Sequence, residues 1–309
     1  MKVGFAFDAL GISEVPDGKH RFLIRLAKQM KKEGIKVDNK NPDVCIRLPR
    51  EKPSKKAKIN ILRVDGLIFN TEWNYKHKNK KIVKSIDDSN AIIYQGKFCL
   101  DAYTKFLNIK KKYAVIPNGA DPNEFLPRNT GNFFLANSRW RPHKRLLMII
   151  DCFLEALKKG IDADLIVTGK PDIKIKHKRI KYVGWQKSTQ LKKILARAIA
   201  SLHLTWLDWC PNSMVEAIVA RCPIIYTECG GHKDIACGSG IGVKDVQWNW
   251  KPLNLYDPPK LDIKEIVNAM FKLKNGNKIY PVRNDLDIKI VCKQYLDFSE
   301  KLLNNKKRR

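Results

Sequence analysis

The chain has 309 residues, enough for one large or two medium-sized domains with a sizeable hydrophobic core. Its hydrophobic fraction of 44% is ordinary for a globular protein. The charge is unusual, because 60 lysines and arginines against 31 acidic residues leave a formal net charge of +29. Such a field favours anionic partners: nucleotide diphosphates, phospholipid surfaces, acidic glycans or nucleic acid. A solvated lysine-rich surface without a specific partner explains the charge at least as well.

The cysteines and the N-terminal segment predict a cytosolic protein. The eight cysteines are scattered and form no C-x-x-C pair, which is typical of reduced, mostly buried thiols. The opening MKVGFAFDAL enters a predicted strand directly, so no signal peptide is expected. No stretch approaches the roughly 20 apolar residues that span a bilayer.

The first part of the chain alternates short apolar runs with amphipathic segments. We predict strands over 2–7, 44–48, 58–64, 91–94 and 113–116, and helices over 22–34, around 82–86 and over 98–106. Strands that alternate with helices imply a parallel, doubly wound sheet, whose ligands bind at the carboxyl ends of the strands.

The same alternation restarts after a loop that contains Asn118-Gly119 and Pro122. We predict strands over 132–137, 164–168, 180–183, 200–206 and 222–227, and helices over 145–158, 188–198, 211–220, 261–273 and 287–303. Ser188 is a candidate cap for its helix. The sequence therefore predicts two α/β domains in succession.

The segment 202–235 carries the strongest chemical signal. Pro211 suits the first turn of a helix, and Asn212 or Ser213 is a candidate cap. A helix N-terminus at the carboxyl edge of a parallel sheet favours a phosphate group. Asp208 before this helix and Glu216 inside it can accept hydrogen bonds from sugar hydroxyls. A phosphate-binding helix end flanked by two such carboxylates predicts a nucleotide-sugar pocket. A solvated turn aspartate and an ordinary helix glutamate explain the pair equally well.

A basic loop follows the first strand of the second domain. Arg139 and Lys144 lie five residues apart between that strand and the next helix, so both cations can converge on a diphosphate. In a chain this basic, a loop without a ligand is the alternative. Further on, Gly230-Gly231 permits close backbone approach at the same sheet edge.

Together these motifs resemble the retaining glycosyltransferases of the family-four type. The resemblance rests on Asp-x7-Glu around CPNSMVEA, on Arg-x4-Lys in the basic loop, on IPNGADPNEF at 116–125, and on Gly230-Gly231. The chain departs from the family pattern at Ser138, Asp208 and Asp234, where the family has Gly, Glu and Glu. The resemblance implies a GT-B fold, in which two Rossmann-like, doubly wound parallel-sheet domains face a central cleft. It implies an acceptor domain at 1–125, a donor domain at 132–285, and a final helix at 286–309 that packs back across the domains and ends in a basic tail.

Site roles are also carried over from the resemblance. Arg139 and Lys144 are expected to neutralise the leaving diphosphate, Asp208 to hold the transferred sugar, and Glu216 to hold the ribose hydroxyls. The expected donor-binding residues are Gly18, Gly184, Trp185, Cys210, Pro211, Asn212 and Ser213. The acceptor-side candidates are Arg63, Asp65, Asn70 and Asn74. Two alternatives stay open: Trp185 either stacks on the base or packs in the core, and Asp65-Gly66 is also explained as a plain turn.

The implied reaction moves a sugar from a nucleotide-sugar donor to an acceptor hydroxyl with retention of configuration, and needs neither a metal ion nor a cofactor. The implied partners are that donor, a glycan or lipid-linked acceptor, and an anionic membrane surface at which a cytoplasmic protein would bind peripherally. Nucleic acid is not expected, since no RNA-binding signature or aromatic stacking platform accompanies the lysines. Three alternatives remain: a nucleic-acid-binding Rossmann-like protein, a catalytically inactive binding protein with the same fold, and a sugar-nucleotide epimerase.

Overall fold

A computed structural model describes residues 1–7, 9, 18–276 and 283–307. The chain divides into two compact units. Unit 1 comprises Met1–Ala120, Trp250–Pro252 and Asp285–Arg309, and unit 2 comprises Asp121–Asn249 and Leu253–Asn284. Each unit is built on one six-stranded sheet, and the strand pairings in both sheets are parallel. The predicted α/β class with two parallel sheets is confirmed.

The sheet of unit 1 has the strand order β2-β1-β3-β4-β5-β6. Its strands are β1 (Lys2–Phe5), β2 (Lys36–Val37), β3 (Val44–Arg47), β4 (Ile59–Arg63), β5 (Ala91–Tyr94) and β6 (Tyr113–Val115). Every residue of β3 and β5 is buried. That pattern arises because helices cover both faces of a parallel sheet, so both sides of a central strand must be apolar.

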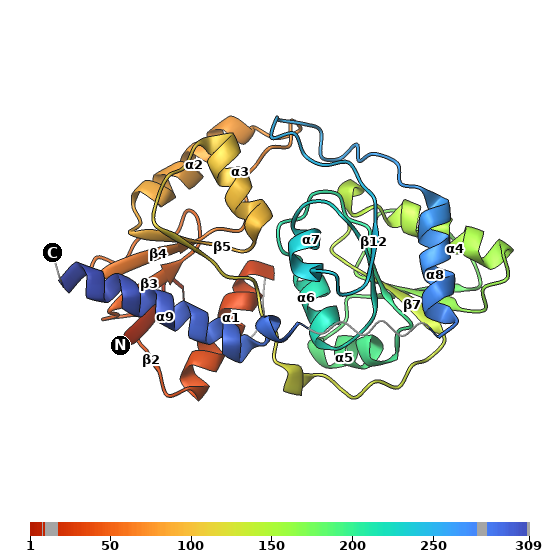
Figure 1. Ribbon diagram of the computed structural model, residues 1–309, viewed down its shortest axis with the longest axis horizontal. Coiled ribbons are helices and arrows are strands. Elements are labelled where there is room, and N and C mark those ends of the chain that lie inside the picture. Colours follow the sequence, from red (N-terminus) through yellow and green to blue (C-terminus); the bar gives the residue numbers. More distant parts are fainter. Residues whose placement is uncertain (8, 10–17, 277–282, 308–309) are drawn as a thin grey trace. The chain divides into compact units, whose positions relative to one another are not determined.

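The helices of unit 1 form two layers around this sheet. They are α1 (Gly18–Lys32), α2 (Tyr75–Asp87), α3 (Lys97–Leu107) and α9 (Ile288–Lys307). Figure 1 shows α1 and α9 on one face and α2 and α3 on the other. The final helix belongs to the core of unit 1, where Val291 and Tyr295 are fully buried in the cluster that contains Phe22 of α1.

The sheet of unit 2 has the strand order β12-β11-β10-β7-β8-β9. Its strands are β7 (Phe133–Asn137), β8 (Asp164–Thr168), β9 (Ile180–Gly184), β10 (Ser201–His203), β11 (Ile224–Thr227) and β12 (Ile241–Val243). Its helices are α4 (Leu146–Lys158), α5 (Ser188–Arg197), α6 (Asn212–Val219), α7 (Gly231–Ala236) and α8 (Ile263–Lys274), with short 3₁₀ turns at Pro122–Glu124 (η1) and Pro142–Lys144 (η2). A third 3₁₀ turn, η3 (Asn284–Leu286), precedes α9.

The core of unit 2 lies between its sheet and the helix pair α4 and α8. Phe153 of α4 and Met270 of α8 are fully buried in one cluster with Phe134 and Val167 of the sheet. Figure 1 shows α4 beside α8, with α6 and α7 on the other side of the sheet. This arrangement leaves the carboxyl ends of β7, β10 and β11 at one edge, which positions the site described below.

Several local predictions were wrong. The strand predicted over 200–206 ends at His203, because the backbone N–H of Trp206 leaves the sheet and donates to the carbonyl of His143 at 2.9 Å. The short elements β2, α7 and β12 were not predicted. Lys187, not Ser188, caps α5, and Pro211 caps α6; neither residue makes a side-chain capping hydrogen bond.

Candidate active site

Loops from three strands meet at the carboxyl edge of the unit 2 sheet, as parallel pairing requires. They are residues 138–145 after β7, 204–211 after β10 and 228–230 after β11. The first two loops are joined by the hydrogen bond from Trp206 to His143. Most of the predicted donor-side residues lie on these loops or on α6.

Lys144 and Asp208 form an ion pair across this edge, although 64 positions separate them in the sequence. The lysine and aspartate side chains are 16% and 18% exposed. Burial by itself would raise the pKa of the Asp208 carboxyl, but the Lys144 ammonium and the nearby histidines together outweigh burial, and the pKa lies below its ordinary value. The other carboxylate oxygen accepts the N–H of Trp209 at 2.7 Å. The ion pair is therefore charged at neutral pH, and Lys144 keeps N–H groups that can reach a further acceptor.

Arg145, the residue after Lys144, anchors the same loop to the interior of unit 2. Arg145 has a left-handed backbone, with φ at 53°, which is uncommon outside glycine. Its guanidinium donates two hydrogen bonds to Asp245, at 2.6 and 3.1 Å, and one to the carbonyl of Pro259 at 2.8 Å. The Asp245 side chain is fully buried. No motif marked Arg145, and its partner lies 100 positions away, so sequence reasoning missed it.

Three buried histidines of unit 2 lie on η2, β10 and α7. His143, His203 and His232 are 7%, 5% and 0% exposed. Burial lowers the pKa of these imidazoles to about 3, 3 and 4, so all three are neutral at physiological pH. One ring nitrogen of each has no hydrogen-bond partner among the described residues, whereas Nδ1 of His232 lies 3.1 Å from Oγ1 of Thr227. Sequence reasoning gave these histidines no role, although His203 stands within the apolar run LHL.

The two consecutive glycines lie directly behind the Asp208 turn. A Cβ at Gly231 would lie 1.7 Å from the carbonyl oxygen of Trp209, and one at Gly230 would lie 2.9 Å from that of Asp208. Gly230 also has a positive φ of 58°. The N–H of Gly231 donates to the Asp208 carbonyl at 2.7 Å. The close approach expected of this pair is thus an approach to the chain's own backbone, which fixes the turn that presents Asp208.

The N-terminus of α6 lies next in sequence to that turn. Pro211 fits there because its φ of −68° is already that of a helix. The first turn of an α-helix presents N–H groups that have no acceptor within the helix. Asn212 and Ser213 are half-buried in this turn, Cys210 is buried, and Glu216 is only 6% exposed one turn further on.

The remaining donor-side residues of unit 2 are exposed or lie in open surroundings. Arg139 is exposed in the loop that carries Lys144. Gly184 has a φ of 68°, and the direction of its missing side chain is open. Trp185 is 57% exposed, so the alternative prediction that it packs in the core is wrong. An exposed indole beside an open glycine leaves the stacking role available.

Arg63 and Asp65 belong to a polar network at the carboxyl edge of the unit 1 sheet. Arg63 is 1% exposed, pairs with Asp65, and donates to Oδ1 of Asn118 at 2.5 Å. Its guanidinium also lies 4.7 Å from the ring centroid of Phe22. Gln95 donates a hydrogen bond of 2.9 Å to Asp65. The network joins the ends of β4, β5 and the segment after β6.

The other unit 1 candidates have local structural roles. Asn74 caps α2, since its side chain accepts the N–H of His77 at 3.1 Å. Asn70 is buried and accepts the N–H of Glu72 at 3.2 Å. Gly18 is exposed at the first position of α1. These contacts account for Asn74 without a ligand.

Comparison with known proteins agrees with this geometry. Residues 131–247 match the family described as glycosyl transferases group 1. That segment is therefore similar to this family. It contains Arg139, Lys144, Asp208 and Glu216, the four residues expected to be catalytic.

A curated relative also matches about half of the chain. A probable sucrose-phosphate synthase from Thermosipho melanesiensis is 25% identical over 175 residues, which are 50% of this chain. The alignment covers 40% of the length of that relative.

Solved structures extend the likeness to the whole fold. HepE from Anabaena in complex with UDP has a TM-score of 0.67 at 13% identity, over 97% of this chain and 100% of that one. Sucrose-phosphate synthase from Thermosynechococcus elongatus has a TM-score of 0.64 at 11% identity, over 99% and 97%. The fold is that of the GT-B glycosyltransferases.

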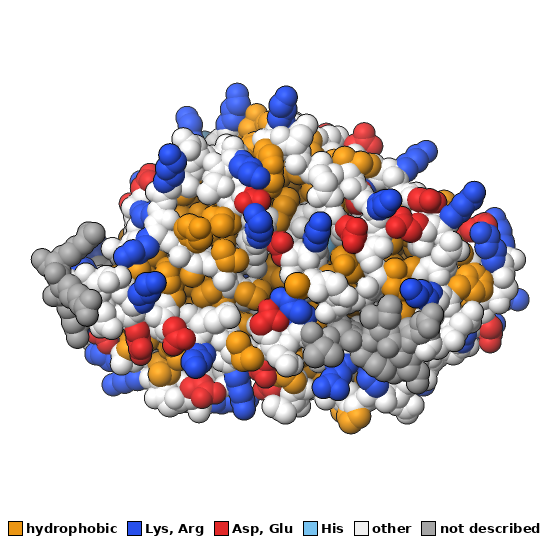
Figure 2. Space-filling model, viewed as in Figure 1, with side chains coloured by type: hydrophobic (Ala, Val, Ile, Leu, Met, Phe, Trp, Pro, Cys, Tyr) orange, Lys and Arg blue, Asp and Glu red, His pale blue; other side chains and the backbone are white. Residues whose placement is uncertain are grey.

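The surface charge does not gather into one patch on the face in view. Figure 2 shows lysine and arginine side chains spread over that face and mixed with acidic and apolar ones. Within the described ranges, no group of three or more His, Cys, Asp or Glu is arranged to hold a metal ion. No described helix has both the length and the apolar character needed to cross a bilayer. All eight cysteines are free, and seven are buried, as predicted.

Proposed function

We propose that this chain transfers a sugar from a nucleotide-sugar donor to an acceptor hydroxyl. The observation that carries the proposal is the ion pair between Lys144 and Asp208, at the sheet edge and beside the N-terminus of α6. It lies inside the segment that matches the group 1 glycosyl transferases. A cation, a carboxylate and a helix N-terminus in one place suit a ligand that has a diphosphate and sugar hydroxyls.

Each group has a separate role in the proposed reaction. Lys144 donates one N–H to Asp208 and the others to the diphosphate, whose negative charge grows as it leaves. Arg139 adds a planar fork of donors to the same group. Glu216 accepts the ribose hydroxyls, and Asp208 accepts a hydroxyl of the transferred sugar. The first turn of α6 stabilises the departing phosphate through its N–H groups.

The proposed stereochemical course is retention without a covalent intermediate on the protein. The acceptor oxygen forms a bond to the anomeric carbon on the face from which the diphosphate leaves. The bond between that carbon and the phosphate oxygen breaks, and the proton of the acceptor hydroxyl goes to the leaving phosphate. Because protein cations neutralise the diphosphate here, the proposed reaction needs no metal ion.

The first donor to test is a UDP-sugar, since HepE has been solved with UDP and with UDP-glucose. We propose a glycan or lipid-linked acceptor for the hydroxyl. We further propose that the protein is cytoplasmic and binds anionic membranes peripherally; its positive net charge supports the attraction to such membranes.

The decisive experiment measures sugar transfer by wild type and by matched variants. Thermal-shift screening of UDP, GDP and ADP identifies the base, because a ligand of the native state raises the melting temperature. With the cognate donor, Lys144→Met and Glu216→Gln should each lower kcat/KM by roughly 10²- to 10³-fold. Lys158→Met removes a lysine that is 77% exposed and should leave the rate unchanged.

Other outcomes distinguish the alternatives. Nucleotide binding without any turnover would indicate an inactive binding protein, and turnover to a free epimeric donor would indicate an epimerase. Retention is checked by the anomeric coupling constant in the NMR spectrum of the first product. Loss of activity in EDTA would contradict the metal-independent mechanism.

A further inference from the structure

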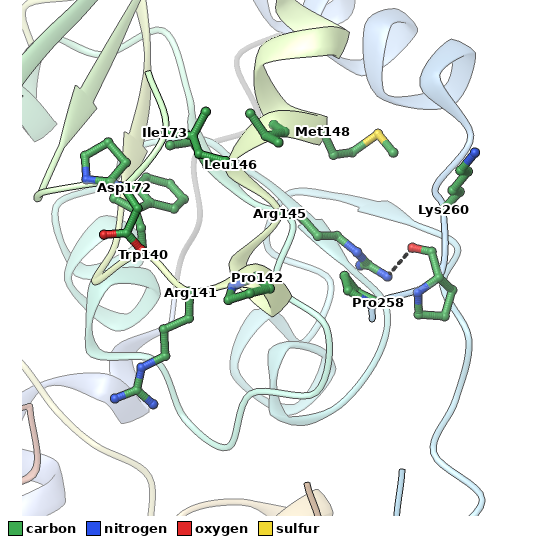
Figure 3. A pocket seen from close by; sticks show the side chains of 13 residues that line it. Trp140, Arg141, Pro142, Arg145, Leu146, Met148, Asp172, Ile173, Pro258 and Lys260 are labelled. Atoms are coloured by element: carbon green, nitrogen blue, oxygen red, sulfur yellow. Dashed lines mark hydrogen bonds between the residues drawn. The ribbon is translucent and has the colours of Figure 1, made fainter. Parts of the chain in front are cut away.

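Unit 2 contains a cavity of about 350 Å³ beside the N-terminal end of α4. Its walls are formed by residues 140–142 and 145–148 around the start of α4, and by residues 171–173 and 258–260. Figure 3 shows their side chains around the open space, with Trp140 and Ile173 on one side and Pro258 on the other. The proposed donor mechanism uses none of the side chains that line this cavity.

The walls of the cavity are mainly apolar. Trp140, Leu147, Met148 and Ile173 line it together with four prolines. The Trp140 indole is held in place, since its Nε1–H donates to the carbonyl of Thr168 at 2.7 Å. Leu147 and Ile173 are 44% and 57% exposed, so large apolar side chains face solvent here. A mostly apolar, partly preformed cavity at the small end of the usual range for ligand sites suits one aliphatic chain or one small ring system.

The charges around the cavity favour an anionic group at its rim. Arg145 lines the cavity, but its guanidinium is paired with Asp245 and adds no net charge. Arg141 and Lys260 are exposed cations, against the single carboxylate of Asp172. The lining therefore carries a positive net charge, and the whole chain adds a field of the same sign.

We propose that this cavity binds the aliphatic chain of a single-chain anionic amphiphile, such as a fatty acid, with the anionic head at the cationic rim. An aliphatic chain satisfies the apolar walls without leaving a polar group unpaired, whereas a polar ligand would lose hydrogen bonds to water there. Each buried methylene should strengthen binding about four-fold. The head group stays in water beside Arg141 or Lys260, so it contributes less than the chain does.

The test is isothermal titration calorimetry of the full chain with decanoate, octanoate and 1-decanol. Decanoate should bind at one site per chain, about 15-fold more tightly than octanoate and measurably more tightly than 1-decanol. Arg141→Glu should weaken decanoate about five-fold. Met148→Trp fills the cavity and should weaken it more than ten-fold. Val246→Trp places the same ring at a site that is 53% exposed and does not line the cavity, so it should bind like wild type.

Several results would overturn the assignment. Equal affinity for 1-decanol and decanoate would remove the role of the anionic head. Unchanged binding by a folded Met148→Trp variant would place the chain elsewhere. If that variant does not fold, Arg141→Glu decides, because its side chain is exposed and its loss should not disturb the fold. Complete exclusion of decanoate by saturating UDP would show that the cavity is part of the nucleotide site.

Discussion

Lowering the pH from 8 to 5 should destabilise the native chain strongly, because unit 2 buries three neutral imidazoles. His143, His203 and His232 have pKa values lowered by burial to about 3, 3 and 4, against an ordinary value of 6.5. Below pH 6.5 the unfolded chain binds protons at these positions and the native chain does not. The stability they contribute is therefore complete above pH 6.5 and is lost as the pH falls toward 4.

The magnitude follows from the pKa differences. Between pH 6 and pH 4, each of these histidines should lower the free energy of unfolding by roughly 1.4 kcal/mol per pH unit, which amounts to about 2 kcal/mol each at pH 5. Lys144 opposes protonation of all three, whereas Asp208 favours it. The combined loss in free energy of unfolding from these three histidines approaches the total free energy of unfolding of an ordinary domain. Acid unfolding should therefore begin between about pH 5 and pH 4.

The assay is urea unfolding at pH 8, 7, 6 and 5, combined with NMR titration of the imidazole C–H signals in the folded chain. His232→Asn keeps an amide near Oγ1 of Thr227 and removes one titrating group, so the dependence of stability on pH should fall by about a third. His177→Gln is the matched control at an exposed site. Titration of the assigned His143, His203 and His232 signals near pH 6.5 in the folded chain would refute the reasoning, and so would a His232→Asn variant with the slope of wild type.

Three further predictions concern the framework of the two sheet edges. Gly231→Ala would place a methyl group on the Trp209 carbonyl oxygen and should lower the melting temperature or abolish folding, as circular dichroism would show. Arg145→Met leaves the buried Asp245 carboxylate unpaired and should cost about 3–5 kcal/mol in urea unfolding, part of which Asp245→Asn should restore. Arg63→Lys cannot reproduce both contacts of the guanidinium and should cost about 1–3 kcal/mol; an unchanged unfolding midpoint would contradict the network described for unit 1.

The sheet framework could be predicted because buried parallel strands appear as short apolar runs. The run AIIY at 91–94 becomes β5 without a change of boundary. The missed α7 has six residues and begins with the second of two glycines, which are signals of a loop. Its helical turn depends on packing against the Asp208 turn, a tertiary contact that no local pattern records. The strand β10 was predicted too long because Leu204 and Trp206 are buried outside the sheet.

The site could be predicted only where residues follow parallel strands. Lys144 and Asp208 come after β7 and β10, which are neighbours in the sheet, so the topology alone brings them to one edge. The topology by itself does not predict that the two side chains form an ion pair. The role of Arg145 needed knowledge that Asp245 is buried opposite it, and the low pKa of His232 follows from complete burial. Both are properties of packing between distant segments.

The left-handed backbone at Arg145 links the donor site to the interior of unit 2. A non-glycine residue in this conformation is strained by about 1–2 kcal/mol, so something must hold it there. The two hydrogen bonds from its guanidinium to the buried Asp245 supply that restraint. Because α4 begins one residue later and Lys144 stands one residue earlier, the restraint fixes where Lys144 leaves the loop. Lys144, which pairs with Asp208, is therefore positioned by the buried ion pair between Arg145 and Asp245. The same loop also carries Trp140, which lines the cavity.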